Sequence, residues 1–163
     1  MKTHPSTVLA ALLLGVLVGG AAVQVATPPD TGTSVPSHGL STATGCADAD
    51  DPRGWVGTVP TPDHRAVYLM NYSYRHRDAT VDLRSDLTQP EPGRWVLAIR
   101  TEPDPSDKTL PAECRPRTTI DASVALPTTA ASLGITIDGE TVAVIDTTAP
   151  EPRFFYLLGE ASR

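Results

Sequence analysis

Acidic residues are the first candidates for chemistry in this sequence, because three of them stand close together. Asp48, Asp50 and Asp51 could offer oxygen ligands to a Ca²⁺ ion. A helix-loop-helix calcium loop beginning at Asp48 would need Gly at its sixth position and Glu at its twelfth, where this sequence has Arg53 and Val59. We therefore expect a solvated acidic segment, with an irregular surface Ca²⁺ site as the alternative.

Histidine and cysteine are the other residue types that could hold a metal. A blue-copper centre needs a His shortly after its Cys, and neither His nor Met follows Cys114. The four histidines, His4, His38, His64 and His76, are far apart in the chain and do not favour a zinc site. The sequence therefore predicts no metal and no cofactor.

One tetrapeptide contains a match to a catalytic motif. Arg75-His76-Arg77-Asp78 includes the His-Arg-Asp of the protein-kinase catalytic loop, but the Asn due five residues after the Asp is Leu83. The chain has no Gly-rich phosphate loop, no Gly-x-Ser-x-Gly elbow and no His-Glu-x-x-His pair. We expect a polar hairpin turn here and no catalytic residues.

A stripe of aromatic and basic side chains is the main candidate for a binding face. Residues 65–75 are expected to form a strand, in which side chains two residues apart share a face. Two interpretations remain open: the tyrosines lie at a solvated rim of a sheet, or they form a recognition patch with arginines as polar anchors. The candidate binding face consists of Tyr68, Tyr72, Tyr74, Arg75 and Arg77.

The same expected strand contains the only asparagine of the chain. Asn71-Tyr72-Ser73 is an N-glycosylation sequon. Asn is disfavoured inside strands, so its presence needs a reason. Asn71 is therefore a candidate glycosylation site, with a plain polar strand position as the alternative.

The N-terminal segment indicates export. Val8–Ala26 is an apolar run with a single polar residue, and Lys2 precedes it. Residues 1–26 fit a cleaved signal peptide, because small residues stand at a suitable cleavage point, and also a retained anchor, because the run approaches the ~20 residues that span a bilayer. In both cases the rest of the chain is extracellular, either secreted or anchored to the outer face of the cytoplasmic membrane, and only residues 8–26 contact that membrane.

Composition divides the remaining chain in two. Residues 27–45 are rich in Pro, Ser, Thr and Gly, lack apolar periodicity, and are expected to be a flexible, disordered linker. Residues 46–163 have the usual size of a folded domain. Two cysteines in an exported chain favour a disulfide between Cys46 and Cys114, with two free thiols as the alternative.

Alternation of apolar and polar residues recurs after Gly54 and predicts an all-β domain. The Asp138-Gly139 dipeptide between two alternating segments is typical of a type I′ hairpin turn. Eight short strands suit an immunoglobulin-like two-sheet sandwich, with an open barrel as the alternative. The expected strands are Gly54–Val59, Arg65–Arg75, Ala79–Leu87, Arg94–Thr101, Arg117–Leu126, Ser132–Asp138, Thr141–Thr147 and Arg153–Leu158.

Several of these motifs occur together in one group of exported proteins. The motifs are GTVPTP at Gly57–Pro62, a Cys before an alternating strand, a Leu-Pro pair, and an Ile-Asp-Gly-Glu hairpin. The layout resembles small exported β-sandwich proteins of halophilic archaea that have no assigned function. A preference for Arg over Lys, 11 to 2, and for Asp over Glu, 13 to 6, is typical of that source. The resemblance implies a sandwich fold and supplies no catalytic residues.

Net charge limits the partners. The chain has a net charge of -6, with 19 acidic and 13 basic residues, and its only lysines are Lys2 and Lys108. This composition does not favour nucleic acid, which needs a cluster of basic side chains. We expect a non-catalytic exported or membrane-tethered module that binds an unknown protein or a cell-envelope component. The alternative is an extracytoplasmic hydrolase or an inhibitor of one.

Overall fold

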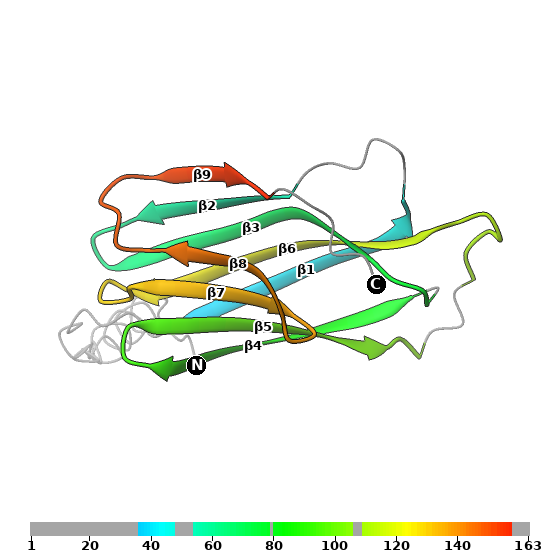
Figure 1. Cartoon of the computed structure of the whole chain (residues 1–163), viewed down its shortest axis with the longest axis horizontal. Coiled ribbons are helices and arrows are strands. Elements are labelled where there is room, and N and C mark those ends of the chain that lie inside the picture. Colours follow the sequence, from blue (N-terminus) through cyan, green and yellow to red (C-terminus); the bar gives the residue numbers. More distant parts are fainter. Residues whose placement is uncertain (1–35, 48–53, 79, 106–108, 158–163) are drawn as a thin grey trace, which may run out of the picture. The chain divides into compact units, whose positions relative to one another are not determined.

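The computed structural model of the chain describes residues 36–47, 54–78, 80–105 and 109–157, and these residues contain strands and no helix. The strands are β1 (Ser37–Cys46), β2 (Trp55–Pro60), β3 (His64–Arg75), β4 (Val81–Glu91), β5 (Arg94–Pro103), β6 (Pro116–Pro127), β7 (Ser132–Ile137), β8 (Glu140–Asp146) and β9 (Arg153–Tyr156). They form a five-stranded sheet in the order β1-β6-β3-β2-β9 and a four-stranded sheet in the order β4-β5-β7-β8 (Figure 1). Paired strands are antiparallel except β5 and β7, which are parallel.

The core lies between the two sheets. On β6, Ile120, Ala122, Val124 and Leu126 are buried while the residues between them face outward, so the expected alternation of this strand is confirmed. Burial of each large aliphatic side chain stabilises the fold by about 1.5–3 kcal/mol. The four-stranded sheet contributes a matching set of buried side chains: Leu97, Ile99, Leu133, Ile135, Ile137 and Ile145. The all-β, two-sheet prediction is confirmed, and the open-barrel alternative is wrong because the strands form two separate sheets.

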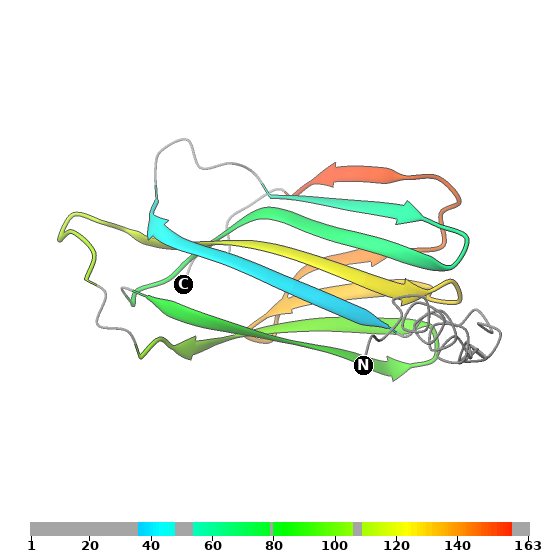
Figure 2. The same cartoon turned by 180° about the vertical axis from the view of Figure 1, so that it is seen from behind.

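Each of the eight expected strands overlaps an observed strand, but the expected linker is wrong at its C-terminal end. Residues 37–45 belong to β1, which pairs with β6 from Ser37 opposite Ala125 to Cys46 opposite Pro116 (Figure 2). Most β1 side chains are exposed, and Leu40 is the residue of this strand that packs against the core. The strand is therefore held mainly by its backbone ladder, which leaves little apolar pattern in the sequence. The expected N-terminal segment, residues 1–26, and the first part of the linker lie outside the described residues.

A bulge at Asn71 reverses the alternation of β3. The pairing of β3 with β6 is regular up to Leu69 and resumes at Tyr72 with a shift in register. Asn71 has a φ of 53°, a left-handed conformation that Asn tolerates better than most residues. Its backbone N–H donates a hydrogen bond of 2.7 Å to Oδ1 of Asp121 on the outer face of β6. The bulge explains why an asparagine stands inside this strand.

Two turns can be compared with their predictions. The hairpin between β7 and β8 is confirmed, with φ of 50° at Asp138 and 82° at Gly139. The segment after Arg75 was expected to be a hairpin turn, and that prediction is wrong, because β3 and β4 belong to different sheets. The segment is a crossing between the two sheets. Residue 79, inside this crossing, is not described.

The predicted disulfide is present. Cys46 and Cys114 are bonded, with their Cα atoms 5.2 Å apart, and the described part of the chain has no free cysteine. The bond joins the last residue of β1 to the segment that leads into β6, beside a backbone hydrogen bond of 2.8 Å from Ala47 to Arg115. It therefore fixes one end of the β1–β6 ladder. A disulfide of this kind is consistent with an oxidising compartment outside the cytoplasm.

Candidate binding face

The structure separates the residues of the predicted binding face. Tyr68 precedes the bulge and points outward with 37% of its surface exposed, whereas Tyr72 and Tyr74 follow the bulge and are only 4% and 8% exposed. Arg75 ends β3, and Arg77 lies in the crossing to β4. The predicted tyrosine stripe is therefore wrong, because one inserted residue turns Tyr72 and Tyr74 into the core.

Tyr74 instead belongs to a polar network at one end of the sandwich. Its hydroxyl donates to Oδ2 of Asp138 at 3.0 Å, and its ring stacks on His76 with centroids 5.9 Å apart. Nε2 of His76 is 3.0 Å from Oγ1 of the fully buried Thr118, which also bonds Oγ1 of Thr44 at 2.7 Å. These hydrogen bonds connect the two sheets. They also give the buried hydroxyl of Thr118 the partners that it requires.

An open hollow of about 500 Å³ adjoins this network. It is lined by Tyr74, His76, Arg77, Asp78, Val81 and Thr101. Nδ1 of His76 is 2.7 Å from the backbone oxygen of Asp78, so both ring nitrogens already have protein partners. The arrangement fixes the crossing between the sheets, and we assign it a structural role.

A different group of side chains forms an exposed aromatic surface on the five-stranded sheet. The antiparallel register places Tyr156, Trp55 and Met70 opposite one another across β9, β2 and β3. The next outward row consists of Phe154, Gly57 and Tyr68. Phe154 is 66% and Tyr156 is 71% exposed, because β9 is the last strand of the sheet order (Figure 1). We call this surface the outer aromatic face; its members are Trp55, Tyr68, Met70, Phe154 and Tyr156.

Gly57 leaves room for two rings of this face to come together above it. A Cβ atom at Gly57 would stand 2.8 Å from Cε1 of Phe154 and 2.9 Å from Cζ3 of Trp55. Both rings therefore reach over the glycine, with centroids 5.8 Å apart and an angle of 57° between their planes. Such tilted contacts are favourable for aromatic pairs. The result is a pair of rings in contact above Gly57, tilted against each other.

A shallow hollow continues the outer aromatic face toward β1. Its volume is about 380 Å³, and its floor consists of small side chains on three neighbouring strands. The residues that line it are Ser37, His38, Gly39, His64, Ala66, Tyr68, Ser123, Val124 and Ala125. Tyr68 belongs to both surfaces, so the aromatic face and the hollow form one continuous site.

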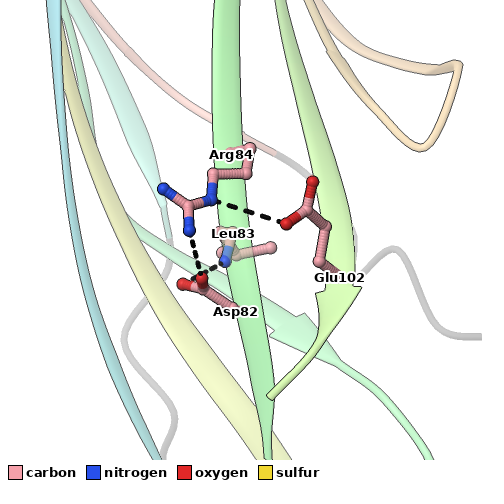
Figure 3. A network of polar contacts seen from close by, with 4 residues as sticks. All are labelled: Asp82, Leu83, Arg84 and Glu102. Atoms are coloured by element: carbon pink, nitrogen blue, oxygen red, sulfur yellow. Dashed lines mark hydrogen bonds and ion pairs between the residues drawn. The ribbon is translucent and has the colours of Figure 1, made fainter. Parts of the chain in front are cut away.

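The outer aromatic face differs in charge from the outer face of the four-stranded sheet. On the four-stranded sheet, Arg84 is 3.1 Å from a carboxylate oxygen of Asp82 and 3.5 Å from one of Glu102 (Figure 3). These exposed ion pairs are typical of a solvated surface and add little stability. The outer aromatic face has no charged member, and the carboxylate of its neighbour Asp121 accepts the hydrogen bond from Asn71. The aromatic side is therefore the candidate for contact with another molecule.

The sequon asparagine borders the same face. Asn71 is exposed and follows Met70 directly, while Tyr72 and Ser73 are buried. An exposed asparagine is accessible to modification. The structure therefore leaves glycosylation at Asn71 as a prediction.

Of the outer aromatic face, only Tyr68 belongs to the binding face predicted from the sequence. Trp55, Met70, Phe154 and Tyr156 all fall in expected strands, but the predicted binding face does not include them. The available signal was the run Phe154-Phe155-Tyr156, because a strand with three consecutive aromatic residues directs at least one of them away from the core. Without the strand order, nothing in the sequence shows that this strand lies beside β2.

Comparisons with models of protein families, with curated proteins and with solved structures find no match. Within the described ranges, no group of three or more His, Cys, Asp or Glu side chains could hold a metal ion. A search of the same residues finds no helix with the length and apolar character to cross a membrane. The acidic segment from Asp48 to Asp51 lies outside the described residues.

Proposed function

We propose that this protein is a non-catalytic binding module that acts outside the cytoplasm and contacts a cell-envelope component through the outer aromatic face. The observation that carries the proposal is the exposure of Phe154 and Tyr156, 66% and 71%, on a surface without charged members. Large exposed apolar patches on soluble domains commonly mark interaction sites. Aromatic side chains also contribute much of the binding energy at such sites.

Several further elements of the proposal concern location and fold. The Cys46–Cys114 disulfide supports an oxidising location, and the apolar run over residues 8–26 supports export or tethering to a membrane. The two-sheet arrangement supports an immunoglobulin-like sandwich, although the parallel β5–β7 pair departs from wholly antiparallel sheets. The resemblance to exported proteins of halophilic archaea fits the same location.

A binding experiment with matched variants tests the proposal. The purified protein is mixed with an envelope fraction of the source cell, and bound protein is measured after sedimentation. The Phe154→Ser, Tyr156→Ser double variant should lose binding while its melting temperature stays close to that of the parent, because exposed side chains contribute little to folding. Val144→Ser is the control, since Val144 is also 71% exposed but lies on the four-stranded sheet. Equal binding by the parent and the double variant would contradict the proposal.

The alternative function, an extracytoplasmic hydrolase or an inhibitor of one, receives less support. A hydrolytic site needs titratable groups that converge on a pocket and are available to a substrate. In the hollow beside Tyr74, the imidazole of His76 is held by Thr118 and by the backbone of Asp78. We therefore place the function on the outer aromatic face.

A further inference from the structure

We infer that the outer aromatic face and the hollow beside Tyr68 together bind a neutral saccharide chain. This inference rests on the proposed function and specifies the chemistry of the envelope component. Sugar rings present flat faces of C–H groups with hydroxyl groups around their edges. A complementary site therefore needs flat apolar surfaces and, beside them, hydrogen-bonding groups.

The apolar surface is provided by aromatic rings on neighbouring strands, and each ring presents a flat face. Phe154 and Trp55 both cover Gly57, and Tyr156 stands directly opposite Trp55 in the ladder. Three strands spaced about 4.8 Å apart and two outward rows separated by about 7 Å give a surface about 10 Å by 7 Å. This size suits one or two sugar rings lying on the sheet.

The exposed area favours a small ligand over a folded protein. The three most exposed rings of the face, those of Phe154, Tyr156 and Tyr68, are 66%, 71% and 37% exposed. With roughly 200 Å² for a whole aromatic residue, they present about 350 Å². A standard protein–protein interface buries about 800 Å² on each partner, which is more than twice that area. The hollow of about 380 Å³ also falls within the range of small-molecule sites.

The hydrogen-bonding groups lie in the hollow. Ser37 and Ser123 contribute hydroxyls and His64 an imidazole to its lining. Nδ1 of His64 is 2.9 Å from Oγ1 of Thr61, which fixes the orientation of the ring. A saccharide that stacks on Tyr68 can therefore extend its hydroxyls over this polar floor. The apolar chains of a lipid cannot form hydrogen bonds with these polar groups, so we favour a saccharide over a lipid.

The charge of the site favours a neutral chain. The face itself has no charged member, and Asp121 at its border accepts the backbone N–H of Asn71 at 2.7 Å. An acidic saccharide would meet this carboxylate without a basic side chain on the face to offset it. The net charge of the whole chain is -6, which also disfavours an acidic ligand.

The experiment compares two envelope preparations and two types of vesicle. The envelope fraction is tested before and after periodate oxidation, which cleaves the carbon–carbon bonds between neighbouring hydroxyls of sugars. Vesicles of phosphatidylcholine alone and with phosphatidylglycerol test a lipid ligand. Tyr156→Ala is the test variant and Val144→Ala the control of equal exposure. Soluble glucans, mannans, xylans and chitin oligosaccharides then compete for the bound protein.

Binding that periodate abolishes, and that Tyr156→Ala weakens about tenfold while Val144→Ala does not, supports the inference. Binding that survives periodate and that none of the soluble saccharides competes with, or that the vesicles reproduce, overturns the saccharide but leaves the proposed function standing. Binding that periodate abolishes but Tyr156→Ala retains overturns the assignment of the sugar to this face. If the parent protein does not bind the untreated envelope, the proposed function itself fails.

Discussion

The Gly57→Ala substitution should disturb the outer aromatic face without disturbing the core. The new Cβ atom would stand 2.8 and 2.9 Å from Cε1 and Cδ1 of Phe154 and 2.9 Å from Cζ3 of Trp55. Non-bonded carbon atoms prefer about 3.5–4.0 Å, so each ring must move by roughly half an ångström to one ångström. Phe154 can make this movement, because it is 66% exposed on an edge strand.

The expected change in folding stability is small. Displacing the Trp55–Phe154 contact loses about 0.5–1.5 kcal/mol, the usual worth of an aromatic pair. Replacing a strand glycine by alanine recovers about 0.5–1 kcal/mol, because the unfolded chain has less conformational freedom to lose. We therefore expect the free energy of unfolding to change by less than about 1 kcal/mol. Val56→Ala, at the neighbouring fully buried position, should cost about 2 kcal/mol.

The measurements are urea unfolding, Trp emission and binding to the envelope fraction. The chain has two Trp, and a Trp95→Phe background leaves Trp55 as the reporter. Gly57→Ala should shift the emission of Trp55 and weaken binding while stability is retained. If Gly57→Ala destabilises the protein as much as Val56→Ala, the rings are part of the core packing. If it changes neither emission nor binding, the rings do not form the contact surface.

Three further expectations follow from particular contacts. Tyr72→Ala should lower the free energy of unfolding by about 3–5 kcal/mol in urea titrations, because the ring is buried; a loss below about 1 kcal/mol would mean that β3 has no bulge. Reduction of the Cys46–Cys114 disulfide, which spans 68 residues, should cost about 4 kcal/mol, and equal unfolding midpoints with and without reductant would contradict this. Hydrogen bonds from the side chain and then the backbone of Thr148 lower the pKa of Asp146, so its stabilising contribution is present above the unfolded pKa and lost as pH falls through the folded pKa. Carbon-13 NMR titration should show a higher pKa of Asp146 in Thr148→Ala, and an unchanged value would show that this hydroxyl does not stabilise the carboxylate.

The elements that sequence analysis predicted correctly are those with local causes. The alternation on β6 follows from one buried and one solvated face, and the turn between β7 and β8 follows from the left-handed conformations of Asp138 and Gly139. The disulfide follows from the presence of two cysteines in the chain. For the strand and the turn, the residues that determine the structure are neighbours in sequence. For the disulfide, two cysteines allow only one pairing within the chain.

The missed strand and the wrong linker have a non-local cause. Residues 37–45 carry Ser, Thr and Gly, and most of their side chains stay exposed in β1. What holds them is the backbone ladder to β6, about 80 residues further along the chain. Backbone hydrogen bonds do not depend on the type of side chain. A strand that is held mainly by them therefore needs no alternation of apolar and polar residues. Composition therefore suggests a linker where the structure has an edge strand.

The candidate site was misplaced for a related reason. The expected tyrosine stripe assumed unbroken alternation along β3, and the single extra residue at Asn71 reversed the direction of Tyr72 and Tyr74. The sequence contained a sign of that reversal, because Asn is disfavoured in a regular strand but tolerates the left-handed conformation of a bulge. The outer aromatic face is different, because its rings come from β2, β3 and β9 and meet only through strand order and register. An outward aromatic residue contributes to a candidate site when its neighbours across the sheet are aromatic too. Which residues are neighbours across the sheet is decided by the fold.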